Sequence, residues 1–252
     1  MNDDVVPRGN DTAAPDAPGS TLDGVKDTSA SCAPDADGGV GASAETQELI
    51  RELARAVDGT GERRGETRLR IIQTAVPEFR AQGYAGTSIR RIADGVGVTP
   101  PALYSHFSSK SELLGVAVVY AHLLFLRTVV VPTDPADPPP GRLEGMIRRA
   151  MGYEFTSSGR KSWFDLLIDN QDEDGLLSPE HHRLSDRARA AYLGELESAV
   201  VRAGGSGTGR LEAEIIFRIC ENTIALQRGL GVSAEATIDA TVRVLLRLPA
   251  GV

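Results

Sequence analysis

Apolar residues recur at intervals of three and four along most of the chain, and this spacing predicts helices with one buried face. The first clear helix extends over about 66–81, where Pro77 is expected to disturb the regular backbone because proline lacks an N–H donor. A second, shorter helix is expected after Thr87 or Ser88, since either side chain can cap its first turn. Gly97 then supplies the left-handed conformation that a tight turn after this helix requires.

A third short helix is predicted to follow that turn. Thr99 is its expected N-cap, and Pro100 and Pro101 are tolerated in a first turn, where backbone N–H groups have no partner within the helix. The pattern Ser109–Glu112 is typical of a capping box, so a fourth helix is expected to begin there and to reach about 131. Two short helices joined by a glycine turn are typical of a helix-turn-helix, whose second helix enters the major groove of DNA.

The same spacing continues to the C-terminus, and no segment alternates polar and apolar residues with a period of two. Further helices are predicted over 142–156, 161–172, 178–203, 210–227 and 234–248. The predicted fold class is therefore all-α. We expect a three-helix domain over 62–110, with the helix-turn-helix motif at 88–107, and a larger helical domain over 111–252.

The N-terminal segment 1–61 differs from the rest of the chain in composition. Residues 1–44 are rich in small and polar residues and have no apolar periodicity, so we expect a disordered acidic tail. A short apolar stripe at 45–57 predicts one short helix within this segment. The segment carries 12 acidic and 4 basic residues, whereas 62–110 carries 4 acidic and 8 basic ones. The net charge of −8 therefore does not argue against nucleic-acid binding, because the helix-turn-helix region is basic.

The cellular location is predicted from the cysteines and from the apolar runs. Cys32 and Cys220 lie far apart in unlike surroundings, which argues against a disulfide framework and favours a reducing compartment. The acidic N-terminus lacks the pattern of a signal peptide. The longest apolar run, 113–126, ends at Arg127 before it reaches the ~20 residues that a membrane span needs. We expect a soluble cytoplasmic protein with no membrane partner.

Enzymatic and metal chemistry find little support in the sequence. The pair His181 and His182 does not match a zinc-binding His-Glu-x-x-His pattern, and polar residues are expected where a helix begins. The acidic run 169–174 lacks the spacing of a calcium loop. No Gly-x-Ser-x-Gly motif follows a strand. The sequence therefore predicts that the chain is not an enzyme and has no cofactor, no catalytic residue and no metal site.

The helix-turn-helix region resembles the tetracycline-repressor (TetR) family. The resemblance rests on Thr87-Ser88-Ile89-Arg90-Arg91-Ile92-Ala93, Gly97-Val98-Thr99, Leu103-Tyr104-Ser105-His106-Phe107 and Ser109-Lys110-Ser111-Glu112-Leu113-Leu114, with Phe79 and Gly83-Tyr84 in the preceding helix. About a dozen positions match in one register without a gap, over roughly 66–120. Two features depart from the family's pattern. Pro77 bears on the shape of the first helix, and the pair Pro100-Pro101 bears on how the third helix reads bases.

The resemblance implies a homodimeric transcriptional repressor that binds a pseudo-palindromic double-stranded DNA operator and is released by a small-molecule effector of unknown identity. It also implies that 111–252 is a ligand-binding and dimerisation domain, whose last two helices form the dimer surface. The implied DNA contacts are Ser88, Arg90, Thr99, Pro101, Ala102, Tyr104, Ser105, His106 and Lys110, with Leu103 and Phe107 in the core.

Two further predictions concern the larger helical domain. Helical domains hold ligand cavities between their helices, and Tyr153 and Trp163 are the aromatic residues expected to line one here. The alternative interpretation is a helical protein-interaction module that has lost DNA binding. Substitution of Tyr104 and His106 discriminates between the two, because a repressor would lose its operator and keep its dimer.

Overall fold

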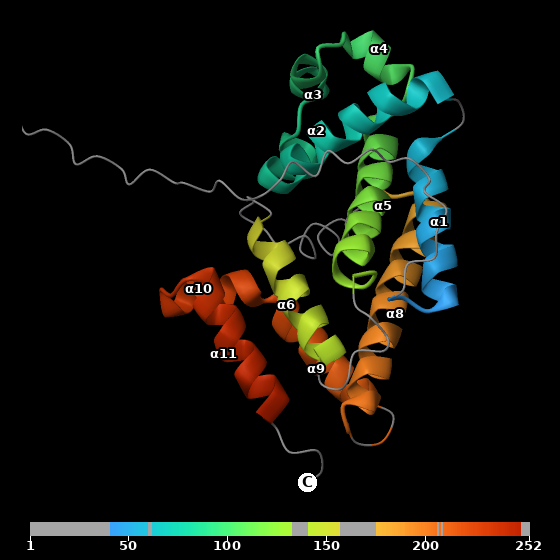
Figure 1. The fold of residues 1–252 in the computed structure, drawn as a ribbon. Helices are drawn as coiled ribbons and strands as arrows, with labels where there is room; N and C mark the ends of the chain where they lie inside the picture. Colours follow the sequence, from blue (N-terminus) through green and yellow to red (C-terminus); the bar gives the residue numbers. More distant parts are fainter. Residues whose placement is uncertain are drawn as a thin grey trace, which may run out of the picture. The chain divides into compact units, whose positions relative to one another are not determined.

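Every regular element in the described part of the chain is a helix (Figure 1). This computed structural model describes residues 41–59, 62–132, 141–156, 175–205, 207 and 209–247, with side chains in the second helix described from residue 65 onward. The helices are α1 (Ala44–Asp58), α2 (Glu62–Gly86), α3 (Ile89–Val96), α4 (Pro100–Tyr104), α5 (Lys110–Val129), α6 (Gly141–Thr156), α8 (Pro179–Arg202), α9 (Arg210–Glu221), α10 (Thr223–Leu230) and α11 (Ala234–Arg247). The predicted all-α class is confirmed. The tail predicted over 1–44 falls mostly, and the helix predicted over 161–172 entirely, outside the described residues.

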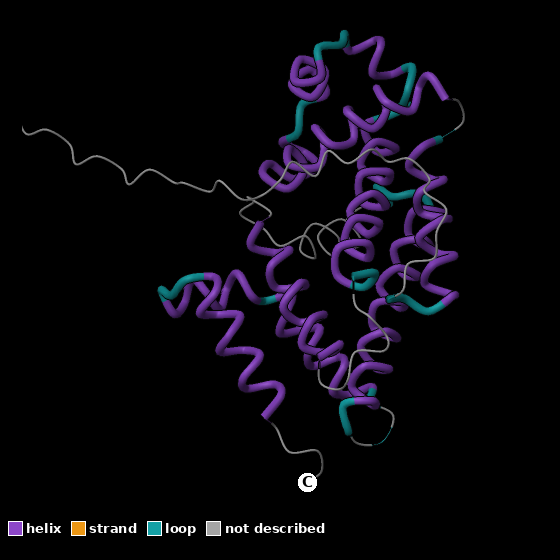
Figure 2. The backbone as a smooth tube through the Cα atoms, viewed as in Figure 1, coloured by secondary structure: helices purple, strands orange, loops and turns teal. Residues whose placement is uncertain are grey.

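Helix α5 is the central element of the described fold and packs against α1, α2, α6 and α8 (Figure 2). It was predicted to reach about 131 and ends at Val129. Of its 20 residues, 14 are buried. Helix α5 is long and apolar enough to cross a membrane by composition, a property that it shares with the buried core helices of folded domains. Because α5 is buried among four neighbouring helices, its environment is that of such a core helix.

A buried polar contact joins α5 to α8. His122 Nε2 and Ser185 Oγ lie 2.8 Å apart in a hydrogen bond, and both residues are buried. Burial disfavours the charged imidazolium and lowers the pKa of His122 to about 4. Near the start of the same pair of helices, Gly115 leaves room for the ring of His181, which a Cβ at position 115 would strike. These contacts set how α8 lies along the central helix.

Helix α2 is longer than the sequence predicted and is interrupted at a different residue. The disturbance was expected at Pro77, but the non-helical backbone lies at Gly83, which has φ 69° and ψ 177°. Proline holds φ near the helical value, but it removes one backbone hydrogen bond, and its ring crowds the carbonyl four residues earlier. Gly83 adopts a conformation that disfavours residues with a side chain. Gly83 therefore interrupts the regular backbone of α2.

The single helix predicted over 210–227 is wrong, because the chain forms α9 and α10 with a break at Asn222. The side-chain Nδ2 of Asn222 donates to the carbonyl of Arg218 at 2.8 Å, and its backbone N–H also bonds to Arg218. Asparagine competes in this way for carbonyls at the end of a helix, which favours a turn over continuation. The two helices together therefore form a bent element.

Helix α1 occupies the position where a short helix was predicted over 45–57. Ser43 is its N-cap, and the Ser43 hydroxyl accepts the backbone N–H of Thr46. One face of α1 carries Leu49, Leu53 and Val57, which are buried where α1 packs against α5 and α8. Although the sequence grouped this helix with the acidic tail, its apolar face is part of the common core.

Candidate nucleic-acid interface

Helices α3 and α4 form a helix-turn-helix at the end of the described fold that lies uppermost in Figure 1. Ser88 caps α3, and its hydroxyl accepts the N–H of Arg91. Gly97 ends α3 in the left-handed conformation, with φ 78° and ψ 31°. Thr99 then caps α4 by accepting the N–H of Ala102 at 3.4 Å. The sequence therefore predicted the turn and the α4 cap at the correct residues, and Ser88 rather than Thr87 is the α3 cap.

Buried apolar residues fix α4 against the rest of the unit. Leu103 and Phe107 are almost fully buried, as predicted, and Ile92, Ala93 and Val96 form the buried face of α3. Five of the predicted contact residues on α4 and its ends are exposed to solvent: Thr99, Pro101, Ala102, Tyr104 and Ser105. The exposed fraction of Tyr104 is 48%, which is high for so large a side chain. Helix α4 thus presents a solvent-exposed face while its apolar face is held inside.

His106 is half-buried, whereas the other predicted contact residues on α4 and its ends are exposed. Its backbone carbonyl also accepts a hydrogen bond. The guanidinium of Arg68 in α2 donates through Nη1 to the His106 carbonyl at 2.6 Å. Arg70, two residues further along α2, donates through Nη2 to the carbonyl of Val96 at 2.9 Å. The sequence assigned neither arginine a role. Both hold backbone carbonyls at the ends of the two helices of the motif.

The cations around the motif lie in three different surroundings. Arg90 is exposed and has no ion-pair partner among the described residues, whereas Arg91 Nη1 lies 3.1 Å from Glu78 Oε2. The Lys110 ammonium lies 4.5 Å above the centre of the Tyr84 ring, a cation–π distance. Partial burial lowers the pKa of Lys110. Of these three cations, Arg90 therefore has the fewest internal contacts within the described chain.

The N-terminus of α5 is partly occupied by its own side chains. Ser109 Oγ accepts the N–H of Glu112 at 2.9 Å, and the Glu112 carboxylate accepts the N–H of Ser108. Ser109 therefore caps the helix as the predicted capping box requires, whereas Glu112 bonds to the N–H of Ser108 and not to that of the N-cap residue Ser109. Two backbone donors at the start of α5 are thus satisfied by side chains of the helix start itself.

The residues predicted for a ligand cavity lie far from this interface along the chain. Tyr153 is in α6, where its ring meets that of Phe125 edge-on at 5.4 Å between centroids. Burial is the main cause that raises the pKa of the Tyr153 hydroxyl, and the carboxylate of Glu154 adds to it. Trp163 lies outside the described residues. Within the part of the chain that the structure describes, no cluster of His, Cys, Asp and Glu is arranged to hold a metal ion.

The chain has relatives among known proteins. Residues 71–117 match the family described as bacterial regulatory proteins, tetR family. The transcriptional repressor SCO4008 of Streptomyces coelicolor is 36% identical over 87 residues, which are 34% of this chain and 42% of that protein. The repressor KstR2 of Mycobacterium tuberculosis is 27% identical over 142 residues, which are 56% of this chain and 62% of KstR2. The chain thus spans less than two thirds of the length of these relatives.

Solved structures have the same fold over more of the chain. AibR, in a complex with isovaleryl coenzyme A and operator DNA, has a TM-score of 0.58 and 22% identity, and the match covers 70% of this chain and 96% of AibR. The tetR-family regulator SCO4454 of Streptomyces coelicolor has a TM-score of 0.60 and 20% identity, covering 84% of this chain and 98% of SCO4454. At these identities the likeness concerns the fold alone.

Proposed function

We propose, from the match of residues 71–117 to the tetR family of bacterial regulatory proteins, that the chain is a transcription regulator that binds double-stranded DNA through α3, α4 and the start of α5. The observation that carries this proposal is the environment of α4. Leu103 in α4 and Phe107 just after it are buried, and the remaining face of α4 is exposed to solvent. Such a face is what a recognition helix inserts into the major groove.

The cations and caps of the motif support the same assignment. Arg90 at the start of α3 and Lys110 at the start of α5 flank α4 in sequence, where they are suited to phosphate contacts on either side of a groove. Ser88 and Thr99 cap α3 and α4, the two helices of the motif. The exposed face of α4 and its end carry aromatic and polar groups suited to the bases, namely those of Tyr104, Ser105 and His106. Phosphate contacts fix the register of the motif, and base contacts select the sequence.

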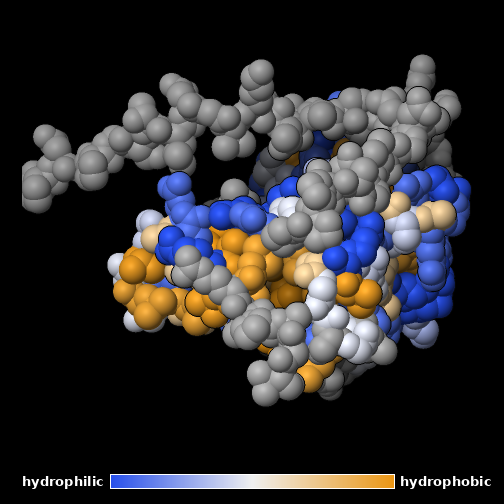
Figure 3. Space-filling view, turned by 60° about the horizontal axis from the view of Figure 1, so that its bottom comes forward, coloured by the Kyte–Doolittle hydropathy of each residue, from blue (hydrophilic) through white to orange (hydrophobic). Residues whose placement is uncertain are grey.

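We propose further that the active form is a homodimer joined through α9, α10 and α11. Large apolar side chains are exposed on these helices, and Figure 3 shows apolar surface gathered on one side of the molecule. They are Leu211, Ile215, Leu226, Leu230 and Val244, and Val232 is exposed in the turn between α10 and α11. Ile215 and Leu226 line a shallow hollow of about 440 Å³ with Arg218 and Asn222. Exposed apolar side chains gathered on neighbouring helices are typical of an interface between subunits. Two copies would then place two recognition helices on successive half-sites, about 34 Å apart or slightly more.

Regulation is proposed to act through an electrostatic interaction between α2 and α6. Arg80 of α2 and Glu154 of α6 are both buried; burial lowers the pKa of Arg80, and the Glu154 carboxylate opposes this shift. Tyr153, the predicted ligand contact, is the neighbour of Glu154 in α6. A small molecule that binds beside Tyr153 would therefore alter the surroundings of a charge on the helix that precedes the DNA-binding motif. Release from DNA would follow as a shift between two arrangements of the dimer.

The test of the proposed function begins with selection of duplexes from random-sequence DNA by the purified chain. We expect a pseudo-palindromic site, and binding that weakens steeply with salt because phosphate contacts release counterions. The double variant Tyr104→Ala, His106→Ala should lose this site and keep the wild-type dimer. A dimer that selects no duplex at low ionic strength would contradict the proposal and favour the alternative, a helical protein-interaction module.

A further inference from the structure

Helix α1 is an element of this chain that precedes the segment matched by the family, and it lies along two helices of the core. Its 15 residues make a rod of about 22 Å at 1.5 Å per residue. Its buried face packs against α5 and α8, so the rod is fixed along its length. Each of its two ends is tied by an arginine to another part of the molecule.

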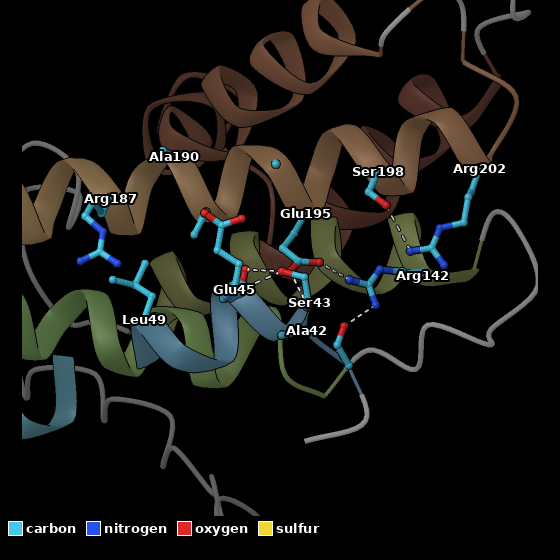
Figure 4. A pocket seen from close by; sticks show the side chains of 14 residues that line it. Ala42, Ser43, Glu45, Leu49, Arg142, Arg187, Ala190, Glu195, Ser198 and Arg202 are labelled. Carbon is cyan, nitrogen blue, oxygen red and sulfur yellow. Dashed lines mark hydrogen bonds and ion pairs between the residues drawn. The ribbon is translucent and has the colours of Figure 1, made fainter. Parts of the chain in front are cut away.

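The N-terminal end of α1 is held by a buried ion pair (Figure 4). Arg142 at the start of α6 lies 2.5 Å from Glu195 of α8, and the side chains of both residues are only 5% exposed. The other carboxylate oxygen of Glu195 accepts the N–H of Ser43 at 2.7 Å, and Arg142 donates to the carbonyl of Gly41. These bonds join α6 and α8 to the first turn of α1. They line one side of a pocket of about 450 Å³.

The C-terminal end of α1 is held by Arg68, which also holds the end of α4. Arg68 Nε donates to the Val57 carbonyl at 2.9 Å, while Nη1 donates to the His106 carbonyl at 2.6 Å. The guanidinium carbon lies 4.2 Å from the centre of the Phe107 ring. Carbonyls at the end of a helix lack partners within it and carry partial negative charge, which a guanidinium satisfies well. One side chain therefore joins the last turn of α1 to the end of the recognition helix.

Gly59 allows this arrangement. Its φ is +66°, and a Cβ at this position would lie 3.1 Å from Arg68 Nε. An alanine at 59 would therefore be strained and would also press on the guanidinium. Gly59, which lets Arg68 approach Val57, therefore lies outside the helix-turn-helix.

We infer that Arg68 is a positioning residue, which holds the recognition helix α4 in a fixed orientation relative to α1. Through this contact, α1 sets the affinity for DNA. This inference rests on the proposed function. Arg68 attaches the end of α4 to α1, and the other end of α1 is bonded to α6 and α8. This attachment adds to the direct connection from α4 into α5 along the chain. A loss of this attachment leaves α4 folded but no longer held in the orientation that fits the groove.

The first test compares Arg68→Lys with the wild-type chain on the duplex that the wild-type chain selects. Lysine keeps the charge but cannot bond to both carbonyls in the planar geometry of a guanidinium. We expect at least a tenfold loss of affinity, with an unchanged dimer and an unchanged dependence on salt, because Arg68 is half-buried and does not contact phosphate. Far-ultraviolet circular dichroism and urea unfolding report whether the variant folds.

The second test reaches the same guanidinium from outside the DNA-binding unit. Gly59→Ala should also weaken DNA binding, and the double variant Gly59→Ala, Arg68→Lys should bind no more weakly than Arg68→Lys alone, since both act through one side chain. Gly65→Ala in α2 is the matched control, because a Cβ there meets no atom within 4 Å. If Arg68→Lys does not fold, Gly59→Ala decides the question by itself.

The outcomes separate the two proposals. If the wild-type chain selects a duplex and the folded variants bind it as tightly as the wild type, the role of Arg68 and α1 is refuted while the proposed function stands. If their salt dependence falls instead, Arg68 acts through phosphate contact and the positioning role is also refuted. If the wild-type chain binds no duplex, the proposed function and this inference fail together.

Discussion

Arg90 and Arg91 are neighbours on α3 but lie in different surroundings. Arg90 is exposed, whereas Arg91 is paired with Glu78. We predict that Arg90→Ala lowers affinity for all duplexes and reduces the slope of log affinity against log salt by about 0.9 for each phosphate that the protein no longer neutralises. Arg91→Ala is the matched control and should have a smaller effect, because its guanidinium already has a carboxylate partner. Equal reductions of affinity in the two variants, measured by fluorescence anisotropy at several salt concentrations, would contradict this assignment.

His122 should make the stability of the fold depend on pH. Its pKa of about 4 lies below the ordinary histidine value of 6.5, so between these values the unfolded chain binds a proton that the folded chain does not. The free energy of unfolding should therefore fall as the pH drops from 6.5 to 4, by about 1.4 kcal/mol per pH unit, and stay low below that range.

The variant His122→Gln tests this prediction, since glutamine can retain the hydrogen bond to Ser185 and does not titrate. Between pH 7 and pH 5 the variant should gain about 2 kcal/mol in stability relative to the wild type. Urea unfolding at the two pH values gives this difference directly. If the difference between the two chains does not change with pH, the imidazole does not titrate as its burial implies.

At the scale of helices, the apolar surface of α9, α10 and α11 leads to a prediction about assembly. The double variant Leu226→Glu, Leu230→Glu places charges on the exposed face of α10, where a second copy would bury them. We expect sedimentation velocity to show monomers at concentrations at which the wild type is dimeric, with a matching fall in affinity for DNA. Arg55→Glu on the exposed side of α1 is the control and should remain dimeric. A dimeric double variant would place the subunit interface elsewhere.

The helices near the motif were predictable because their signals are local. Ser88, Thr99 and Ser109 are followed by the residues whose N–H groups they cap, and Gly97 stands where the turn needs a left-handed residue. The break at Asn222 was missed because the apolar positions continue in register on either side of it. There the competing bond of the asparagine side chain, and not the periodicity, decides the backbone.

The candidate site was only partly predictable, because the residues that hold it in place lie far away in the sequence. The exposed face of α4 follows from its own sequence, given that Leu103 and Phe107 are buried. The role of Arg68 depends on the carbonyl of a residue 38 positions away and on the end of α1. An amphipathic stripe shows that α1 has a buried face but does not identify α5 and α8 as its neighbours. Likewise, Arg80 looks like an ordinary surface arginine in the sequence.

At the scale of the whole molecule, the buried Arg80 and Glu154 should couple the DNA-binding unit to α6. Removing either of these buried charges takes away the electrostatic interaction that favours the charged form of the other. We predict that Arg80→Met and Glu154→Gln each destabilise the fold by at least about 1 kcal/mol. The double variant should be more stable than the sum of the two single effects implies.

The exposed pair Arg51 and Glu48 provides the matched comparison, measured by the same urea unfolding. The charged atoms lie 2.7 Å apart and both side chains are more than half exposed, so each single substitution should destabilise the fold much less than the substitutions at 80 and 154. Strictly additive effects at 80 and 154 would mean that the two charges do not sense each other, and the proposed route of regulation would lose its first step.

The ion pair between Arg142 and Glu195 also constrains how such a chain can change over generations. Exchanging either residue breaks this ion pair and also removes a hydrogen bond to the backbone at the start of α1. Descendants that keep the N-terminal helix should therefore keep both residues. In descendants without that helix the two positions are free to change. The presence of both residues should therefore correlate with the presence of the helix.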